Sequence, residues 1–217
     1  MANLSGPSWG PGLGGAPRQL VFLIHGLGAD GRDLIDLAPY FAASLPHALF
    51  LAPDAPYPCD MAPFGRQWFS LRSRDPALLE AGARQVAPML ESFIETELAR
   101  WNLTDYALLG FSQGAMMSLF TGLRSTVPPR AILAYSGALL APQALAAEAV
   151  NLPPILIAHG EDDDIVPVSY SHDAENQLRA AGLAVEAVYE PDLRHGLGEA
   201  GLAAGAALLA SVFQEMA

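Results

Sequence analysis

The chain has 217 residues, of which 52% are hydrophobic and 16% are charged, and its formal net charge at pH 7 is −12. This length and apolar content suit one α/β domain, so we expect a single domain over residues 1–217. With only 11 Lys and Arg side chains, the chain lacks the clustered cations that nucleic acid or an anionic membrane would require, which argues against both partners.

The first residues and the single cysteine indicate where in the cell the protein is expected. Residues 1–17 have neither the basic nor the apolar segment of a secretory signal, and they are rich in Gly, Pro and Ser. They predict an N-terminal arm, either loosely held or lying along an edge of the domain. Cys59 is the only cysteine, so no intrachain disulfide can form. No apolar run reaches the roughly 18 to 20 residues that cross a bilayer. We therefore expect a cytoplasmic protein without stable membrane association.

Short apolar runs bounded by turn residues predict buried strands of a parallel sheet. These runs are 20–24, 49–52, 105–109, 131–135, 155–158 and 183–189, the last near a sheet edge. Helices are expected over 32–41, over 76–101, after Ser112 and at the Ala- and Leu-rich C-terminus, and Pro88 should kink or divide the second of them. Strands that alternate with helices predict an α/β fold with a mostly parallel central sheet and helices on both faces.

The motif Gly110-x-Ser112-x-Gly114 stands between a predicted strand and a predicted helix. A serine on so tight a turn is tolerated only where its neighbours lack bulky side chains. The hydroxyl would then lie at a helix N-terminus, where the N–H of Gln113 can bind the negative oxygen of a tetrahedral intermediate. The context predicts that Ser112 is a nucleophile, although a glycine-rich chain can carry this motif by chance.

The glycine-rich loop after the first strand has two interpretations. Gly26-x-Gly28-x-x-Gly31 has the spacing of a dinucleotide-binding loop, and Asp54 follows where such a site places its ribose-binding acid. In a serine hydrolase the corresponding loop instead supplies the second oxyanion-hole N–H, here that of Leu27. The Ser112 motif favours the second interpretation. His25 is then expected to bond to the backbone and not to act as a base.

Residues 53–74 form a long irregular connection that is rich in proline and aromatic residues. Such connections frequently form binding surfaces. Met61, Phe64 and Trp68 are therefore candidate walls of a substrate pocket, with packing onto the core as an equally supported alternative. Cys59 lies in the same connection and is expected to be inert.

Ser112, the acidic run 161–164 and His195 each follow directly after a predicted strand. Because parallel strands end at the same edge of a sheet, we expect all three at that edge. Their order, Ser then Asp then His, is the order of the α/β-hydrolases. In such a triad the histidine takes the serine proton during attack and returns it to the leaving group, while the acid fixes the tautomer of the imidazole.

The acid of this triad must be one of the four consecutive acidic residues 161–164. Residues in a turn point in different directions, so one carboxylate of 161–164 can face His195 while the others face solvent. Asp163 is favoured because Ile165 and Val166 can anchor the far end of its turn, and these two side chains are also candidate substrate contacts. The run lacks the glycine and closing glutamate of an EF-hand, so no metal site is expected.

Together these motifs resemble those of the phospholipase/carboxylesterase family of α/β-hydrolases, which includes bacterial carboxylesterases and acyl-protein thioesterases. The resemblance covers the chain from about Gln19 to its end and is carried by 25–31, 67–69, 110–114, 159–167 and 195–196. It implies an α/β-hydrolase fold with a minimal lid, ester or thioester substrates and no cofactor. It also implies a role for each site residue: Ser112, Asp163 and His195 as the triad, and Leu27 and Gln113 as oxyanion donors.

We accordingly expect a carboxylesterase that acts on small esters of short to medium acyl length. An acyl-protein thioesterase or lysophospholipase is the alternative within the same chemistry, although the 53–74 connection looks shorter than in the eukaryotic thioesterases, which argues against long acyl chains. A non-catalytic binding protein with the hydrolase fold is disfavoured, because the complete set of Ser112, Asp163 and His195 is present. A homodimer remains an open alternative.

Overall fold

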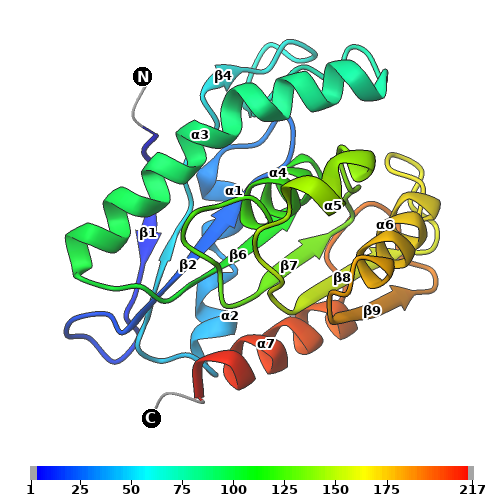
Figure 1. The fold of residues 1–217 in the computed structure, drawn as a ribbon. Helices are drawn as coiled ribbons and strands as arrows, with labels where there is room; N and C mark the ends of the chain where they lie inside the picture. The colour runs from blue at the N-terminus through cyan, green and yellow to red at the C-terminus, as the bar shows by residue number, and fades with distance from the viewer. Residues whose placement is uncertain (1–3, 215–217) are drawn as a thin grey trace.

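A mostly parallel sheet crosses the structure, a computed structural model that describes residues 4–214 (Figure 1). Its seven strands lie in the order β1-β3-β2-β6-β7-β8-β9. β1 pairs antiparallel with β3, and the other neighbours pair in parallel. The strands are β1 (Ser8–Trp9), β2 (Gln19–Ile24), β3 (Ala48–Leu51), β6 (Tyr106–Phe111), β7 (Ile132–Tyr135), β8 (Ile155–Gly160) and β9 (Val185–Glu190). Each predicted strand is confirmed close to its expected bounds, and β9 lies at an edge.

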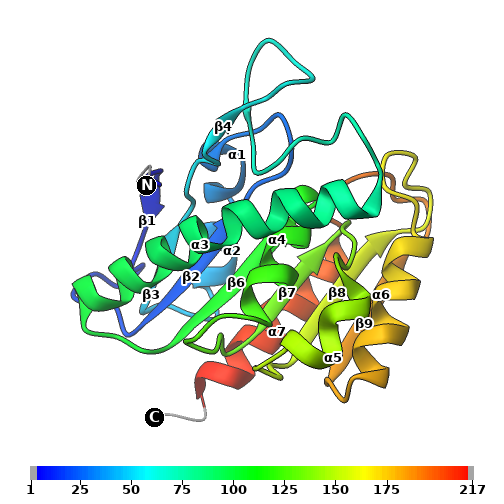
Figure 2. The same cartoon turned by 45° about the horizontal axis from the view of Figure 1, so that its top comes forward.

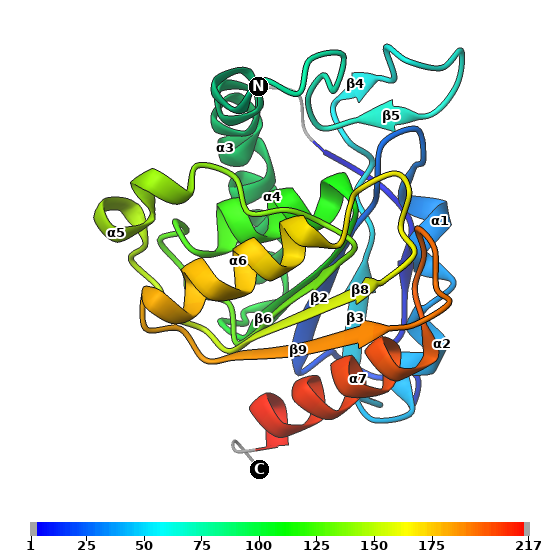
Figure 3. The ribbon, with the colours of Figure 1, turned by 90° about the vertical axis from the view of Figure 1, so that its right-hand side faces the viewer.

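Helices cover both faces of the sheet (Figure 3). One face carries α3 (Pro76–Trp101), α4 (Gln113–Gly122), α5 (Leu145–Glu148) and α6 (Ser169–Ala180), with the short 3-10 helix η1 (Pro142–Ala144) before α5; the other carries α1 (Gly31–Ile35), α2 (Ala38–Ala42) and α7 (Glu199–Gln214). Because side chains alternate along a strand, β2 sends Phe22 into the core under α3 and α4, and Leu23 into the core under α1 and α2. Both side chains are fully buried.

Two prolines affect their helices in opposite ways, and the sequence pattern alone did not predict which would end a helix. The helix expected over 32–41 is divided into α1 and α2, because Pro39 occupies the first turn of α2, where a fixed φ and a missing N–H suit a helix start. Pro88, in contrast, does not divide α3. It lies on the exposed face of the helix, while Val86 and Leu90 are buried, so the carbonyl that loses its partner can be hydrated.

The N-terminal arm lies along an edge of the sheet. Ser8 pairs with Leu51 in β3, and the carbonyl of Pro7 accepts a hydrogen bond of 3.0 Å from the N–H of Ala52. Leu4 is buried against the core. The edge arrangement is therefore the correct alternative for residues 4–17, whereas residues 1–3 lie outside the described part of the chain.

The carboxyl ends of the parallel strands share one edge, where open α/β sheets bind their ligands. Ser112 follows β6, the acidic run follows β8, and His195 follows β9. The 53–74 connection contains a separate hairpin, β4 (Tyr57–Pro58) with β5 (Arg66–Gln67), and projects beyond the end of the sheet (Figure 2). Among residues 4–214, no helix is long and apolar enough to cross a membrane.

Candidate active site

Ser112 lies on a sharp turn between β6 and α4. Its φ is 55° and its ψ is −117°, a conformation that L residues rarely adopt and that costs on the order of 1–3 kcal/mol. The flanking glycines make the turn possible, because a Cβ on Gly110 would collide with the carbonyl of Gly114, and a Cβ on Gly114 would collide with the carbonyl of Ile24. The N–H of Ser112 donates to the carbonyl of Tyr135 at 2.8 Å, which fixes the turn to β7. Close packing therefore explains both glycines of the motif.

Three side chains meet at this edge of the sheet. Nε2 of His195 lies 3.0 Å from Oγ of Ser112, and Nδ1 of the same ring lies 2.6 Å from Oδ2 of Asp163. An ionised carboxylate can only accept hydrogen bonds, so Nδ1 carries the ring proton and Nε2 is free to accept the proton of Ser112. The Asp163 side chain is fully buried, whereas 17% of the His195 side chain is exposed. This arrangement can transfer a proton from Ser112 to a ring that faces the substrate.

The environment of Asp163 keeps its carboxylate ionised. Burial raises the pKa of Asp163, but hydrogen bonds from His195 and from the backbone N–H groups of Val166 and Ile165 outweigh burial, so the pKa lies below its usual range. The two backbone bonds reach Oδ1, each at 2.9 Å. Asp163 is therefore negatively charged at neutral pH and can stabilise an imidazolium at His195.

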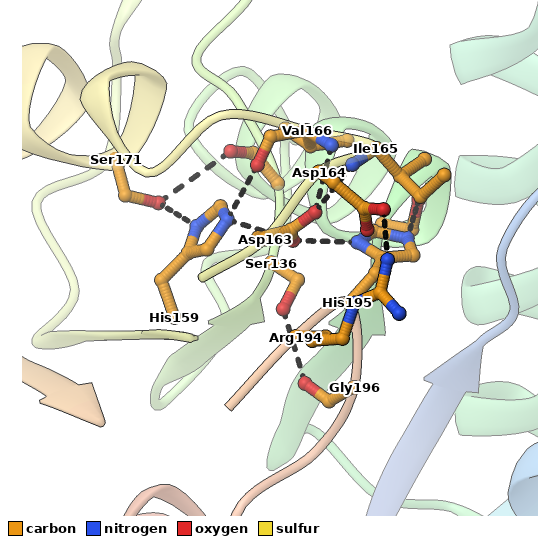
Figure 4. A network of polar contacts seen from close by, with 12 residues as sticks. Ser136, His159, Asp163, Asp164, Ile165, Val166, Ser171, Arg194, His195 and Gly196 are labelled. Atoms are coloured by element: carbon orange, nitrogen blue, oxygen red, sulfur yellow. Dashed lines mark hydrogen bonds and ion pairs between the residues drawn. The ribbon is translucent and has the colours of Figure 1, made fainter. Parts of the chain in front are cut away.

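The other acids of the run face solvent. Glu161, Asp162 and Asp164 are exposed, and Asp164 forms an ion pair with Arg194 at the surface (Figure 4). Within residues 4–214, no three His, Cys, Asp or Glu side chains are grouped so that they could hold a metal ion. Of the four acids, Asp163 is thus the one that the fold turns toward His195.

Backbone N–H groups beside Ser112 can form an oxyanion hole. The N–H of Gln113 begins α4, where no preceding helical turn offers an acceptor. In the glycine loop, the N–H of Gly28 donates to the carbonyl of Arg66, whereas in the described part of the chain the N–H of Leu27 donates to no backbone carbonyl. A Cβ on Gly26 would lie only 3.3 Å from Cβ of Ser112, so this glycine allows the loop to approach the serine. The geometry therefore offers the N–H groups of Leu27 and Gln113 to a developing oxyanion.

His25 and Asp54 support the glycine loop. Nδ1 of His25 donates to the carbonyl of Gly26 at 2.7 Å, and Nε2 accepts the N–H of Ala55 at 3.0 Å. Burial lowers the pKa of His25, which favours the neutral ring that these two bonds require. Oδ1 of Asp54 accepts the N–H of Gly31 at 2.9 Å, so the carboxylate that a dinucleotide site would turn toward a ribose is bonded within the protein. These contacts favour the oxyanion-loop interpretation.

A cavity of about 520 Å³ opens beside Ser112 and His195. Its walls come from the glycine loop, the 53–74 connection, the start of α3, α4, residues 138–143, the loop before α6 and one side of α6 itself. Its larger apolar side chains are those of Leu27, Met61, Leu71, Leu79, Met116, Leu139, Leu140, Ile165 and Val166. Met61 and Ile165 are 58% and 53% exposed, so the cavity opens to solvent. Three of the five expected substrate contacts, Met61, Ile165 and Val166, thus line this space.

The expectation of a pocket wall is wrong for Trp68 and Phe64. Trp68 is fully buried, and its indole N–H donates to the carbonyl of His25 at 2.9 Å, so the ring packs beneath the glycine loop. Phe64 is 73% exposed and lies at a separate surface depression beside Gly28 and Asp30. The aromatic composition indicated that the connection was unusual, but it did not show in which direction each ring points.

Sequence analysis missed the role of the Gln113 side chain. Its Oε1 accepts the backbone N–H of Trp68 at 2.9 Å, and its Nε2 donates to the carbonyl of Phe69 at 2.7 Å. The side chain is fully buried. One amide therefore fixes the 53–74 connection to the turn that carries Ser112. The glutamine next to the serine in the motif 110–114 was the available signal.

Two further polar residues near the triad were also missed. Ser136, directly after β7, donates its hydroxyl to the carbonyl of Gly196 at 3.1 Å and so holds the loop of His195 (Figure 4). His159, near the end of β8, is buried beside Asp163, with its Nε2 3.0 Å from Oδ2. Its place in the motif 159–167 was the only sequence signal for this contact.

Comparisons with known proteins agree on one family. The family model described as Phospholipase/Carboxylesterase matches residues 14–212. Esterase YpfH of Escherichia coli (strain K12) is 29% identical over 188 residues, which cover 83% of this chain and 77% of YpfH. Acyl-protein thioesterase 1 of Schizosaccharomyces pombe is 34% identical over 159 residues, which cover 68% of this chain and 69% of the thioesterase. The crystal structure of esterase PE8 superposes with a TM-score of 0.92 at 40% identity, covering 97% of this chain and 100% of that one.

Proposed function

Because the chain belongs to the phospholipase/carboxylesterase family of ester hydrolases, we propose that it cleaves small carboxylic esters of short to medium acyl length through an acyl-enzyme on Ser112. The observation that carries the proposal is the unbroken line of hydrogen bonds from Oγ of Ser112 through both nitrogens of His195 to Asp163. The α/β-hydrolase fold provides the remaining requirement, a serine on a strained turn at a helix N-terminus.

The reaction proceeds in two halves. As Oγ of Ser112 attacks the carbonyl carbon, its proton moves to Nε2 of His195, and the negative oxygen of the tetrahedral intermediate accepts hydrogen bonds from the N–H groups of Leu27 and Gln113. The intermediate collapses when the imidazolium returns the proton to the alcohol oxygen that leaves. Water then attacks the acyl-enzyme with His195 again as the base, which releases the acid and restores Ser112. Asp163 stabilises the imidazolium in both halves.

The cavity supports an acyl substrate. Its apolar lining suits an acyl chain, and its volume of about 520 Å³ leaves room for a short to medium chain. A thioester is the second candidate substrate, supported by the 34% identity to the thioesterase of Schizosaccharomyces pombe. The same triad can cleave both bonds, so only the leaving group differs.

We also propose a small-molecule substrate without nucleic acid or a stable membrane partner, in line with the net charge of −12. A cytoplasmic location is supported by the single, buried and unpaired Cys59. A homodimer is the oligomeric alternative that we retain.

A panel of p-nitrophenyl esters and acyl-CoA thioesters of graded acyl length tests the substrate class. We expect the highest kcat/KM on the short and medium esters. A marked preference for long-chain thioesters would instead favour the thioesterase alternative.

Ser112→Ala is the matching variant for the mechanism. It removes one hydroxyl at the surface of the cavity, so the fold should persist while kcat on p-nitrophenyl acetate falls by about 10⁶-fold, the scale known for a triad nucleophile. Circular dichroism provides the folding control. Substantial turnover by the folded Ser112→Ala protein would contradict the assignment of the nucleophile.

A further inference from the structure

A second histidine contacts the acid of the triad. His159 is 1% exposed, and its ring lies between α6 and the loop that carries Asp163 (Figure 4). Nε2 lies 3.0 Å from Oδ2 of Asp163 and 2.8 Å from the carbonyl oxygen of Val166, and Nδ1 lies 2.7 Å from Oγ of Ser171. The ring thus has a polar partner at each nitrogen.

The chemistry of these partners determines the tautomer of His159. A carboxylate and a carbonyl can only accept, so Nε2 must carry a proton and donate to both. In the neutral ring, Nδ1 then accepts the hydroxyl proton of Ser171. Burial lowers the pKa of His159, and the contacts with Val166 and Asp163 offset only part of this effect, so the ring is neutral at neutral pH.

We propose that His159 is a positioning residue for catalysis, which donates from Nε2 to the same Asp163 oxygen that binds His195 and so holds the carboxylate toward the catalytic imidazole. This inference rests on the triad proposed above. His159 contacts neither Ser112 nor the cavity within the described residues, so its effect on the reaction passes through Asp163.

The hydrogen bonds of Asp163 show why this donor matters. Oδ1 is held by the backbone N–H groups of Ile165 and Val166. Without His159, Oδ2 would be held only by His195, the group that must change its charge during the reaction. His159 supplies a second contact to Oδ2 from a rigid strand end. Because the ring is neutral, it fixes the carboxylate without adding a positive charge that would oppose the imidazolium of His195.

Two amide variants provide a matched test. The side chain of His159→Gln is long enough to bring an N–H to the position of Nε2, whereas His159→Asn reaches only the position of Nδ1. We expect His159→Asn to lose about 10- to 100-fold in kcat on p-nitrophenyl acetate with KM little changed, the scale of one hydrogen bond to a charged group. His159→Gln should recover most of this loss. Thermal unfolding confirms that both variants are folded.

Equal kcat values for the folded Asn and Gln variants would overturn the proposal, as would a wild-type kcat in His159→Asn. Failure of the triad itself gives a different result, namely turnover that survives in Ser112→Ala.

A second measurement uses the unaltered protein. Nitrogen-15 NMR of its labelled histidines, with His159 assigned from its absence in the Gln variant, should show a neutral ring protonated at Nε2 from pH 8 to pH 7. Asp163 and His195 are the titratable groups that act on this ring. A ring protonated at Nδ1 alone, or one that is already an imidazolium at pH 7, would also overturn the proposal.

Discussion

Asp163 differs from the acids beside it in its partners and not in its side-chain chemistry. Glu161, Asp162 and Asp164 are exposed, whereas Asp163 is buried and accepts hydrogen bonds from N–H donors on both carboxylate oxygens. Such a site binds the ionised form because every neighbour donates. At the scale of single residues, the proposed mechanism therefore depends on which of four adjacent carboxylates the turn buries.

Asp163→Asn should lower kcat by about 10⁴-fold, the scale observed when an asparagine selects the wrong tautomer of the catalytic histidine. The backbone donors hold Oδ1, so the new amide nitrogen faces His195 and donates to Nδ1. The ring proton then moves to Nε2, which can no longer accept the proton of Ser112. Steady-state kinetics on p-nitrophenyl acetate measure the loss.

Asp162→Asn and Asp164→Asn are the matched controls, because each removes an exposed charge that salt and water already screen. Both should retain most of the wild-type kcat. If either control is as impaired as Asp163→Asn, the acid of the triad has been assigned to the wrong residue.

At the scale of elements, the site depends on how the 53–74 connection is attached to the turn before α4. The amide of Gln113 accepts the backbone N–H of Trp68 and donates to the carbonyl of Phe69. The N–H of Gly28 and the carbonyl of Arg66 tie the same connection to the glycine loop. The turn of Ser112, the glycine loop and one wall of the cavity are thus held together by a small set of hydrogen bonds.

Gln113→Met keeps the approximate shape of the side chain but leaves two buried backbone groups, the N–H of Trp68 and the carbonyl of Phe69, without partners. We expect the free energy of unfolding to fall by about 2–6 kcal/mol, because each unsatisfied buried polar group usually costs about 1–3 kcal/mol. Urea denaturation measures the change. Gln85→Met, on the exposed face of α3, is the control: it removes only an exposed hydrogen bond to the hydroxyl of Tyr57, so stability should change by no more than about 0.5 kcal/mol. Equal stability of the two variants would show that the Gln113 amide contributes nothing.

The strands and the meeting of Ser112, Asp163 and His195 at one edge of the sheet could be predicted from the sequence, because local rules specify both. A fully buried parallel strand requires a continuous apolar run, and the turn at Ser112 requires glycine on both sides. The direction of Trp68 could not be predicted, since its partners His25 and Gln113 lie more than 40 residues away in the chain. The division of the helix expected over 32–41 was missed, although Pro39 was its visible cause.

We expect the 53–74 connection to affect acyl selectivity as well, because its Met61 lines the cavity. Met61→Trp adds bulk to the cavity, so kcat/KM for p-nitrophenyl octanoate should fall by about 10-fold or more, while the acetate ester changes little, because each buried methylene contributes about 0.8 kcal/mol. Phe64→Trp is the control, since Phe64 lies outside this cavity. A larger effect at Phe64 than at Met61 would mean that the acyl chain binds at the other depression.

At the scale of the whole molecule, the sheet separates two hydrophobic cores. Several buried polar side chains lie instead at the carboxyl edge of the sheet, where they find hydrogen-bond partners. His25 and His159 lie at this edge with exposed fractions of 0% and 1%. Each ring is neutral, with one nitrogen donating and the other accepting. The hydrogen bonds that support the active site therefore also make the stability of the protein depend on pH.

The free energy of unfolding should fall between pH 7.5 and pH 5.5. Burial lowers the pKa of His25 and of His159, while in the unfolded chain both titrate near their ordinary value of about 6.5. Below that value the unfolded chain binds protons that the folded protein does not, so acid favours unfolding by up to about 1.4 kcal/mol per pH unit for each ring. The lowered pKa of Asp163 acts in the same direction but only below about pH 4, outside this window.

Urea denaturation at pH 7.5, 6.5 and 5.5 measures this slope. A His25→Gln variant should show a smaller slope than the wild-type protein, because one of the two buried rings is gone. Stability that does not change between pH 7.5 and pH 5.5 would mean that the buried rings accept protons in the folded state. The neutral tautomers inferred for His25 and His159 would then be wrong, because a doubly protonated His25 could not accept the N–H of Ala55.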